Sequence, residues 1–367
     1  MSELVLRRED ISLLKSIGID VINPNRRYWF LRTQSGTYFN DFLHENFVGI
    51  EWDEVSDINF IKSSSHDDLK KEIQKQYPKI TNSGYISGQI RRFVLGIQPG
   101  DIVLIPSEKS GLIAFGEILG DVYIYEEDEF EQFLNAFDDE QECRQIIKKR
   151  RPVRWLHIAK KSELDPYLYR IIYSHNTIID ITVFETFIDR TLSQFYIKGD
   201  TAYLTYKVNR KTNIPYSDVL SFLNNNLKII DFINKYDSSI NIDINDIILK
   251  MNVQSKGPIQ FTGKMKSVLV IGLAIALLVG AEFKINFLKC CEVEYKTEGI
   301  PGLLRTISEI FKDTPEKEKD IAELQDKLEK DIKNLQIQLP ERNHNEILID
   351  ASDSQNVDSI LTNDESE

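Results

Sequence analysis

The chain has 367 residues, of which 41% are hydrophobic and 28% charged, and its formal net charge is −13. This composition excludes a wholly disordered chain, a collagen and a multi-span membrane protein, and the length favours two or more domains. Three cysteines and five scattered histidines offer neither a disulfide framework nor spaced metal ligands. We therefore expect a cytoplasmic protein with no metal and no cofactor. The absence of an apolar run near the first residue agrees with this location.

The negative charge is unevenly spread. Residues 311–367 hold 7 basic and 16 acidic residues, and residues 121–140 hold 9 acidic residues and no basic one. The rest of the chain has 38 basic and 33 acidic residues. A basic surface that binds nucleic acid is therefore compatible with the acidic total.

In chain order, the pattern predicts an α+β protein. Residues 1–23 read as an amphipathic helix and a linker. Residues 24–158 read as a compact unit of short strands, with helices at 67–77 and 88–95. Its expected strands lie at 27–32, 47–52, 102–106, 111–118, 122–125 and 150–158.

Residues 159–311 read as a second α+β domain with an effector or assembly role. Its clearest elements are a hairpin over 195–208, in which Gly199 and Asp200 separate two alternating runs, and a helix over 216–234. Residues 312–339 predict an amphipathic helix that suits either pairing with a second copy or packing on the body. Residues 340–367 are acidic, lack aromatic residues and predict a disordered tail.

One apolar segment has two readings. Residues 267–281 contain no charged residue and are mostly aliphatic. A very apolar helix or strand buried in the second domain would explain this run. Membrane insertion is the alternative, although about 20 apolar residues are the usual spanning length. The second reading would make the protein an effector associated with the inner membrane.

Aromatic residues crowd the start of the second stretch. Eight lie within 25 residues: Tyr28, Trp29, Phe30, Tyr38, Phe39, Phe42, Phe47 and Trp52. A pocket for an unpaired or flipped base needs aromatic faces for stacking and polar groups for the base edge. The same residues could equally form the core of a small β-barrel.

The order of short motifs adds to this pattern. A Tyr-Trp strand (Arg27 to Arg32) is followed by Gln89-Ile90-Arg91-Arg92-Phe93, by Gly100-Asp101 before an apolar strand, and by GLIAFGEI, GDVYIY and Arg151-Pro152-Val153-Arg154-Trp155. This series resembles the EVE domain of the PUA-like superfamily, which includes the YTH readers of methylated RNA. Ile86 and Ser87 depart from the family's Arg-Asn pair.

The resemblance implies a PUA-like β-barrel with flanking helices that binds DNA or RNA through a modified or flipped base. It implies stacking by Trp29, Trp52, Tyr85 and Phe93, base-edge contacts by Ser87 and Gln89, and phosphate contacts by Arg91, Arg92 and Arg154. Such domains often serve as sensors beside an effector in bacterial modification-dependent restriction and phage-defence proteins. We therefore expect a nucleic-acid sensor, and the apolar stripe over 321–339 would allow it to form a homo-oligomer.

Catalysis is the weaker expectation. No phosphate-binding loop, GxSxG, HExxH or CxxC motif occurs in the sequence. A metal-dependent nuclease remains an alternative, because Glu282-Phe283-Lys284 and Glu294-Tyr295-Lys296 have the acidic-x-Lys form and Asp246 precedes them.

Overall fold

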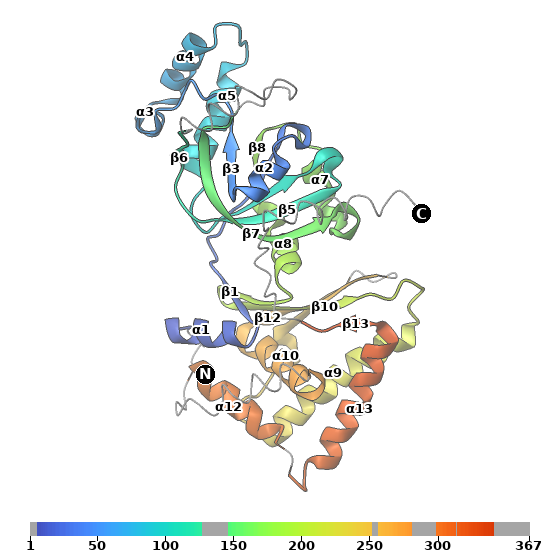
Figure 1. Ribbon diagram of the computed structural model, residues 1–367. Helices are drawn as coiled ribbons and strands as arrows, with labels where there is room; N and C mark the ends of the chain where they lie inside the picture. The colour runs from blue at the N-terminus through green and yellow to red at the C-terminus, as the bar shows by residue number, and fades with distance from the viewer. Residues whose placement is uncertain (1–5, 127–145, 252–255, 281–298, 313, 341–367) are drawn as a thin grey trace. The chain divides into compact units, whose positions relative to one another are not determined.

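The computed structural model describes residues 6–126, 146–251, 256–280, 299–312 and 314–340 (Figure 1). Within these residues the chain has a mixed α+β fold, as the sequence pattern predicted. It divides into two units, each with its own sheet. The first unit comprises residues 26–189, and the second combines residues 6–25 with residues 190–340.

The first unit is built on a curled sheet. Its strand order is β3-β7-β5-β4-β2-β8, with β6 beside β7. The strands are β2 (Tyr28–Leu31), β3 (Phe47–Ile50), β4 (Ile102–Pro106), β5 (Leu112–Ile118), β6 (Tyr123–Ile124), β7 (Lys149–Lys160) and β8 (Ile178–Asp180).

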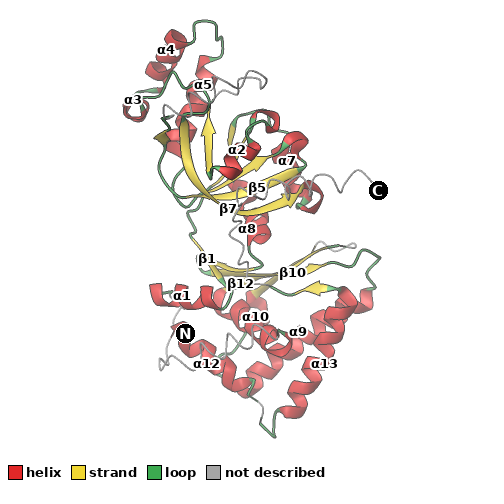
Figure 2. Cartoon of the chain, in the orientation of Figure 1, coloured by secondary structure: helices red, strands yellow, loops and turns green. Residues whose placement is uncertain are grey.

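The curl comes from the long strand β7. Its first residues, Lys149 to Pro152, pair with β3, whereas the residues from Val153 onward pair with β5. A bulge between Phe115 and Gly116 adds to the bend. The sheet therefore wraps into half a barrel (Figure 2). Among the described strands, β3 and β8 end the sheet without pairing to each other, so the expected barrel is open.

Short helices surround this sheet. They are α2 (Phe39–His44), α3 (Ile58–Ser63), α4 (His66–Gln76), α5 (Ser83–Arg91), the π-helical turn η2 (Arg92–Gly96) and α7 (Tyr169–Ile172), with 3₁₀ turns η1 (Gln34–Gly36), η3 (Glu108–Ser110), η4 (Lys161–Glu163), η5 (Pro166–Leu168) and η6 (Thr182–Phe184). In Figure 1, α3, α4 and α5 gather at one end of the unit. The guanidinium of Arg151 holds η2 to β7, because it donates to the carbonyls of Phe93, Val94 and Gly120.

The first unit extends beyond the expected boundary at residue 158. Strand β8 pairs with β2, with Trp29 opposite Asp180, and therefore belongs to the same sheet. The hydroxyl of Tyr28 also donates to the Asp189 carboxylate in α8 (Glu185–Leu192). A strand of three residues is too short to show an alternating pattern, which explains why the sequence placed this stretch in the second domain.

The second unit packs helices on one side of a second sheet (Figure 2). The sheet order is β1-β9-β10-β12-β11, with β13 beside β10. The strands are β1 (Asp20–Ile22), β9 (Phe195–Lys198), β10 (Thr201–Val208), β11 (Ile247–Met251), β12 (Gly257–Lys264) and β13 (Ile337–Gln338). The helices are α1 (Arg8–Ser16), α9 (Tyr216–Tyr236), α10 (Met265–Val279), α12 (Gly299–Ile310) and α13 (Glu318–Leu335), with the 3₁₀ turn η7 (Ile244–Asp246).

Two predicted elements of this unit are confirmed, and one assignment is corrected. The hairpin joins β9 to β10 through Gly199, whose φ of 61° suits glycine, and α9 follows Pro215. Residues 1–23 were expected to be a separate helix and linker. Instead, β1 pairs in parallel with β9, which makes the start of the chain part of the second unit.

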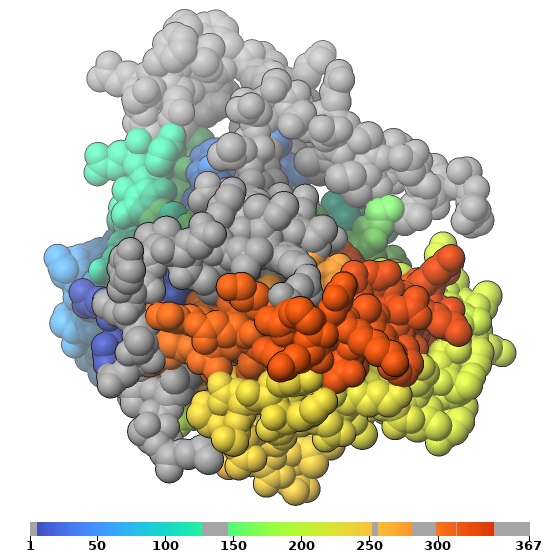
Figure 3. Space-filling view, turned by 90° about the horizontal axis from the view of Figure 1, so that it is seen from below, coloured from blue at the N-terminus to red at the C-terminus, as the bar shows by residue number. Residues whose placement is uncertain are grey.

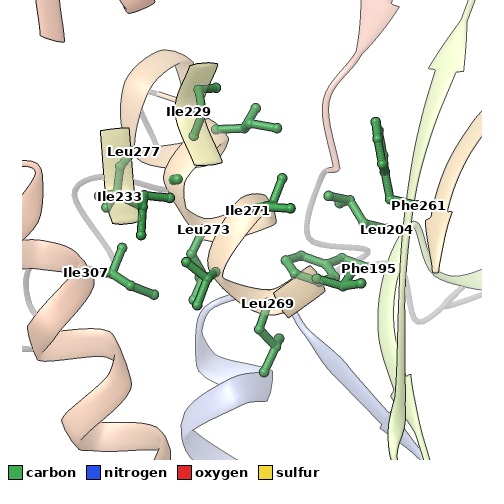
Figure 4. Close-up of a cluster of buried hydrophobic side chains, with 14 of the residues drawn as sticks. Phe195, Leu204, Ile229, Ile233, Phe261, Leu269, Ile271, Leu273, Leu277 and Ile307 are labelled. Carbon is green, nitrogen blue, oxygen red and sulfur yellow. The ribbon is translucent and has the colours of Figure 1, made fainter. Parts of the chain in front are cut away.

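The apolar run 267–281 forms most of α10, a helix of 15 residues. It lies between the sheet and the other helices (Figure 4). Sheet residues Phe195, Leu204 and Phe261 lie on one side, and Ile229, Ile233 and Ile307 lie on the other. The long apolar element that membrane insertion requires is not found: no helix among the described residues is long and apolar enough to cross a membrane.

Helix α13 buries its own apolar stripe. Ile321, Leu324, Leu328 and Leu335 belong to the core of the second unit, and α13 lies beside α9 (Figure 3). The carboxylate of Asp331 accepts hydrogen bonds from Ser221 and Asn225, which fixes the register of the two helices. Of the two readings of this stripe, packing on the body is the one observed, so the stripe no longer argues for a homo-oligomer.

Several predicted features lie outside the described residues. They are the acidic tail from residue 341 onward, most of the acidic run 121–140, and both acidic-x-Lys elements, with Lys284 and Lys296. Asp246, the acidic residue that the nuclease alternative needs, forms an ion pair with Lys264 at 2.7 Å. In the described part of the chain, no group of three or more His, Cys, Asp or Glu side chains could hold a metal ion.

The position of α10 generates a stability prediction. A Cβ atom added at Gly272 would lie 2.6 Å from the Phe195 ring, whereas one added at Gly88 in α5 would meet nothing within 4 Å. Gly272→Ala should therefore lower the free energy of unfolding by about 1–3 kcal/mol through overpacking. Gly88→Ala should raise it by roughly 0.5–1 kcal/mol through helix propensity. Urea unfolding of both variants tests this, and equal stability of the two would contradict the close packing of α10.

Candidate nucleic-acid interface

Backbone strain in the first unit is concentrated around two adjoining cavities. Eight described residues other than glycine have positive φ values. Five of the eight line these cavities: Gln34, Ser35, Trp52, Lys109 and Ser110. Left-handed conformations of such residues cost free energy and persist where the surrounding structure holds them, which is common at functional sites. This clustering points to the two cavities as the functional region of the unit.

The smaller hollow, here called the Trp52 cavity, has a volume of about 270 Å³. Its wall combines aromatic rings with polar and charged groups: Arg32, Gln34, Tyr38, Glu51, Trp52 and Thr177. Pockets for drug-sized ligands are usually about 300–1,000 Å³, so this volume suits one smaller planar group. These residues come from the ends of β2, β3 and β8 and from η1, so the sheet positions all of them.

A buried ammonium group holds Trp52 in place. The Lys149 side chain is fully buried, and its Nζ donates to the Trp52 carbonyl at 2.7 Å and to Asp53 Oδ1 at 3.0 Å. Burial lowers the pKa of Lys149, and the nearby Asp53 carboxylate partly opposes this shift. The two contacts fix the backbone of Trp52, whose φ is 68°, and leave its half-buried ring at the cavity.

A second network orients the polar wall. The Tyr38 hydroxyl donates to Glu51 Oε1 at 3.3 Å, and the Gln34 amide donates to the same oxygen. Burial and the Glu51 carboxylate raise the pKa of Tyr38 to about 12, so its hydroxyl keeps its proton at neutral pH. The Tyr38 ring also stacks on Phe42, with centroids 5.9 Å apart. Both the aromatic face and the hydrogen-bonding groups are therefore fixed before a ligand arrives.

Arg32 has an unused donor. One terminal nitrogen of its guanidinium donates to the Ile172 carbonyl at 3.3 Å. Its Nε is buried and, among the described residues, has no hydrogen-bond partner. A buried donor without a partner costs about 1–3 kcal/mol.

The larger hollow, here called the Ser107 cavity, has a volume of about 790 Å³. It shares Arg32 and Ser35 with the Trp52 cavity and is rich in polar side chains, which include Thr37, Asn40, Ser107, Lys109 and Ser110. The turns η1 and η3 form part of its wall and approach closely. A Cβ atom at Gly36, whose φ is 104°, would collide with the backbone of Glu108.

A shallow groove lies at the other end of β8. This Arg92 groove is lined by Arg27, Trp29, Arg91, Arg92, Leu95, Gly96 and Asp180. Arg27 pairs with Asp180 and its guanidinium lies 4.5 Å from the centre of the Trp29 ring. Arg91 donates to the Ser64 carbonyl at 2.7 Å, and the side chain of Arg92 is exposed. The groove therefore carries three guanidinium groups and one carboxylate.

The structure brings one of the predicted stacking residues, Trp52, to the Trp52 cavity, which it lines directly. Tyr85 does not line this cavity. Its hydroxyl lies 3.2 Å from Thr177 Oγ1 and accepts from the Thr177 amide, so Tyr85 contacts a residue of the cavity wall.

Three predicted residues serve the core instead. Phe93 is fully buried and offers no face to a base. The Ser87 hydroxyl is buried against His66, and the Gln89 amide oxygen accepts from the backbone of Ile178. Gln89 thus links α5 to β8, a strand that lies beyond the domain boundary expected at residue 158. The assignment of Ser87 and Gln89 to a base edge does not fit this geometry.

The remaining predicted residues are split between two places. Trp29 is 2% exposed, and its indole donates to Asp101 at 2.8 Å, so it contributes only a ring edge to the Arg92 groove. Arg91 and Arg92 lie together at that groove. Arg154 pairs with Glu117 on the neighbouring strand β5 and lines none of the three hollows described above.

Sequence reasoning missed Arg32, Gln34, Glu51 and Thr177 as site residues. Glu51 directly precedes Trp52, and Arg32 ends the Tyr-Trp strand, so both stood next to residues already singled out. No pattern in the sequence marked the left-handed turns that bring Gln34 and Ser35 to the cavity. Tyr38 was noted only as one of the crowded aromatics.

The buried ammonium provides a test of how the cavity is held. Lys149→Met should destabilise the first unit by about 3–5 kcal/mol, because it leaves the Asp53 carboxylate buried and unpaired. The double variant Lys149→Met with Asp53→Asn removes both charges and should recover most of that loss. Denaturant unfolding measures both. A single variant as stable as the parent would show that this ion pair does not hold Trp52.

Comparison with known proteins adds one finding. The family model of a domain of unknown function, DUF8426, matches residues 29–182, which span most of the first unit and include all the residues of the Trp52 cavity. No curated protein matches the chain, and no solved structure does.

Proposed function

We propose that the first unit binds an unpaired nucleobase of DNA or RNA in the Trp52 cavity and that the chain acts as a nucleic-acid sensor. The observation that carries this proposal is a preformed hollow whose wall combines Trp52 and Tyr38 with the polar side chains of Arg32, Gln34 and Glu51. Proteins that read single bases combine aromatic faces for stacking with fixed polar groups for the base edge.

The chemistry of the wall supports a base over other small ligands. Glu51 is an acceptor, whereas the Gln34 amide and the Thr177 hydroxyl can do either. Such a mixed set matches the alternating donors and acceptors of a base edge.

The Arg92 groove supplies a place for the phosphates. Thr177, which directly precedes β8, lines the cavity, and Asp180 at the end of β8 lines the groove; at about 3.3 Å per residue this distance is roughly 10 Å. A strand with one base in the cavity could therefore place a neighbouring phosphate near Arg91 and Arg92. The exposed charge of Arg92 is suited to such a contact.

The half-barrel sheet and the order of its motifs support a PUA-like, EVE-related reader as the finer description of the fold. In this proposal the protein is a cytoplasmic sensor of a bacterial defence or surveillance system. The second unit would act as the effector or mediate assembly of several copies. A modified base is a candidate ligand of the first unit. Among the described residues no observation favours a catalytic role, so binding is the activity to measure first.

The base-binding step is tested with Trp52→Ala. Loss of one stacking partner should weaken binding of a single strand by about 1–3 kcal/mol, or roughly 5- to 150-fold in Kd. Fluorescence anisotropy with labelled 12-nucleotide single strands of DNA and RNA, each unmodified or carrying N6-methyladenine or 5-methylcytosine, measures the effect. Tyr216→Ala removes an exposed aromatic residue from the second unit and is the matched control. Equal losses in both variants would contradict the proposed cavity.

The phosphate path is tested with Arg92→Ala. This change should weaken binding of all single strands alike and reduce the slope of log K against log salt by about 0.7. Arg8→Ala, an exposed arginine of α1, should leave the slope unchanged. An unchanged slope in Arg92→Ala would place the strand away from the groove.

A further inference from the structure

We infer that the Ser107 cavity takes the nucleotide next to the base held in the Trp52 cavity, so that the site reads two consecutive nucleotides with the linking phosphate at Arg32. This inference rests on the proposed function. It assigns a second binding subsite, and its ligand class is a single nucleotide unit of an unpaired strand.

The first support is the continuity of the two hollows. Arg32 and Ser35 line both of them, so the hollows meet at these two residues. A ligand that filled only the smaller hollow would leave the larger one, about 790 Å³ in volume, unused. A strand that leaves the Trp52 cavity past Arg32 and Ser35 enters the larger hollow directly.

The second support is the chemistry at the junction. The Nε donor of Arg32 is buried without a partner among the described residues, and its contact with Ile172 is long at 3.3 Å. A guanidinium that lines both hollows is chemically matched to a phosphate. Because the linking phosphate is the one group shared by both nucleotides, Arg32 lies where a dinucleotide needs a cation.

The third support is the character of the larger wall. Ser35, Asn40 and Ser110 offer hydroxyl and amide groups, and Lys109 adds a second cation whose side chain is 91% exposed. These groups suit a sugar and a phosphate better than a second stacked base. Phe39 and Leu112 provide the apolar part of the lining.

The fourth support is the rigidity of this wall. Ser35, Lys109 and Ser110 all have left-handed backbones, and Gly36 packs against the backbone of Glu108. The Ser107 hydroxyl accepts from the Leu112 amide at 2.8 Å, which closes the turn. A subsite built on strained, interlocked turns is preorganised, so little ordering is needed when a ligand binds.

The test compares ligand lengths on the full chain. Calorimetry is run with the common nucleoside monophosphates, with N6-methyl-AMP and 5-methyl-CMP, and with the dinucleoside monophosphates that contain each base, in ribose and deoxyribose forms. At least one dinucleoside monophosphate should bind tenfold or more tightly than either of its mononucleotides. Absence of any gain with length overturns the inference, whereas failure of all ligands to bind overturns the proposed function as well.

Two variants that each replace an asparagine by tryptophan test where the gain in affinity with ligand length arises. Asn40→Trp fills the Ser107 cavity from the exposed surface of α2 and should abolish the gain with length while mononucleotide affinity stays within twofold. Asn59→Trp on α3, an exposed asparagine that lines neither cavity, should keep the gain. A full gain in Asn40→Trp would place the second nucleotide elsewhere.

A less disruptive variant keeps the test valid if Asn40→Trp does not fold. If thermal melting shows that Asn40→Trp is unfolded, Lys109→Ala replaces it, because this side chain is solvent-exposed and its removal leaves the core intact. It should reduce the gain with length severalfold at low salt. An unchanged gain in Lys109→Ala would overturn the subsite.

Discussion

The candidate site of this protein depends on one buried cation. The Lys149 ammonium is removed from water and donates to Trp52 and Asp53. Taking a charge out of water costs several kcal/mol, and only close partners with good geometry offset that cost. The backbone after β3 is therefore fixed where these contacts require it, and Trp52, which packs against the core of the unit, also lines the cavity. Glu51, one residue earlier, faces the same cavity and receives the hydrogen bonds of Tyr38 and Gln34.

Other contacts in the first unit hold the elements that surround this site. Strand β7 carries Lys149 at one end of its curled path, and Arg151, two residues later, holds η2 to the sheet through the carbonyls of Phe93 and Val94. Gln89 ties α5 to β8, which brings Thr177 to the cavity and extends the unit to Asp189. The second unit is organised differently. Its helices bury α10 and the stripe of α13 against one sheet, and Asp331 supplies the polar contact between α9 and α13.

The sequence predicted some of these features for physical reasons. Strong periodicity identified α9, and a glycine with positive φ marked the β9–β10 turn. Trp52 was found because aromatic residues crowd its neighbourhood. The sequence pattern does not show which of these side chains are buried. Phe93, Ser87 and Gln89 were therefore assigned to a ligand that they do not face. Arg32 and Glu51 were missed because their roles arise from left-handed turns and from strand pairing between distant segments, which no local pattern reports.

The most direct test of the account is to map where a single strand touches the protein. Irradiation of the full chain with an unpaired 12-nucleotide RNA or DNA, followed by mass spectrometry of the crosslinked peptides, identifies the aromatic residues in contact with bases. The account predicts crosslinks at Trp52 or Tyr38, with a second crosslinked peptide from the η3 turn of the Ser107 cavity. Crosslinks confined to the second unit, or none in the segment from Arg32 to Trp52, would contradict it.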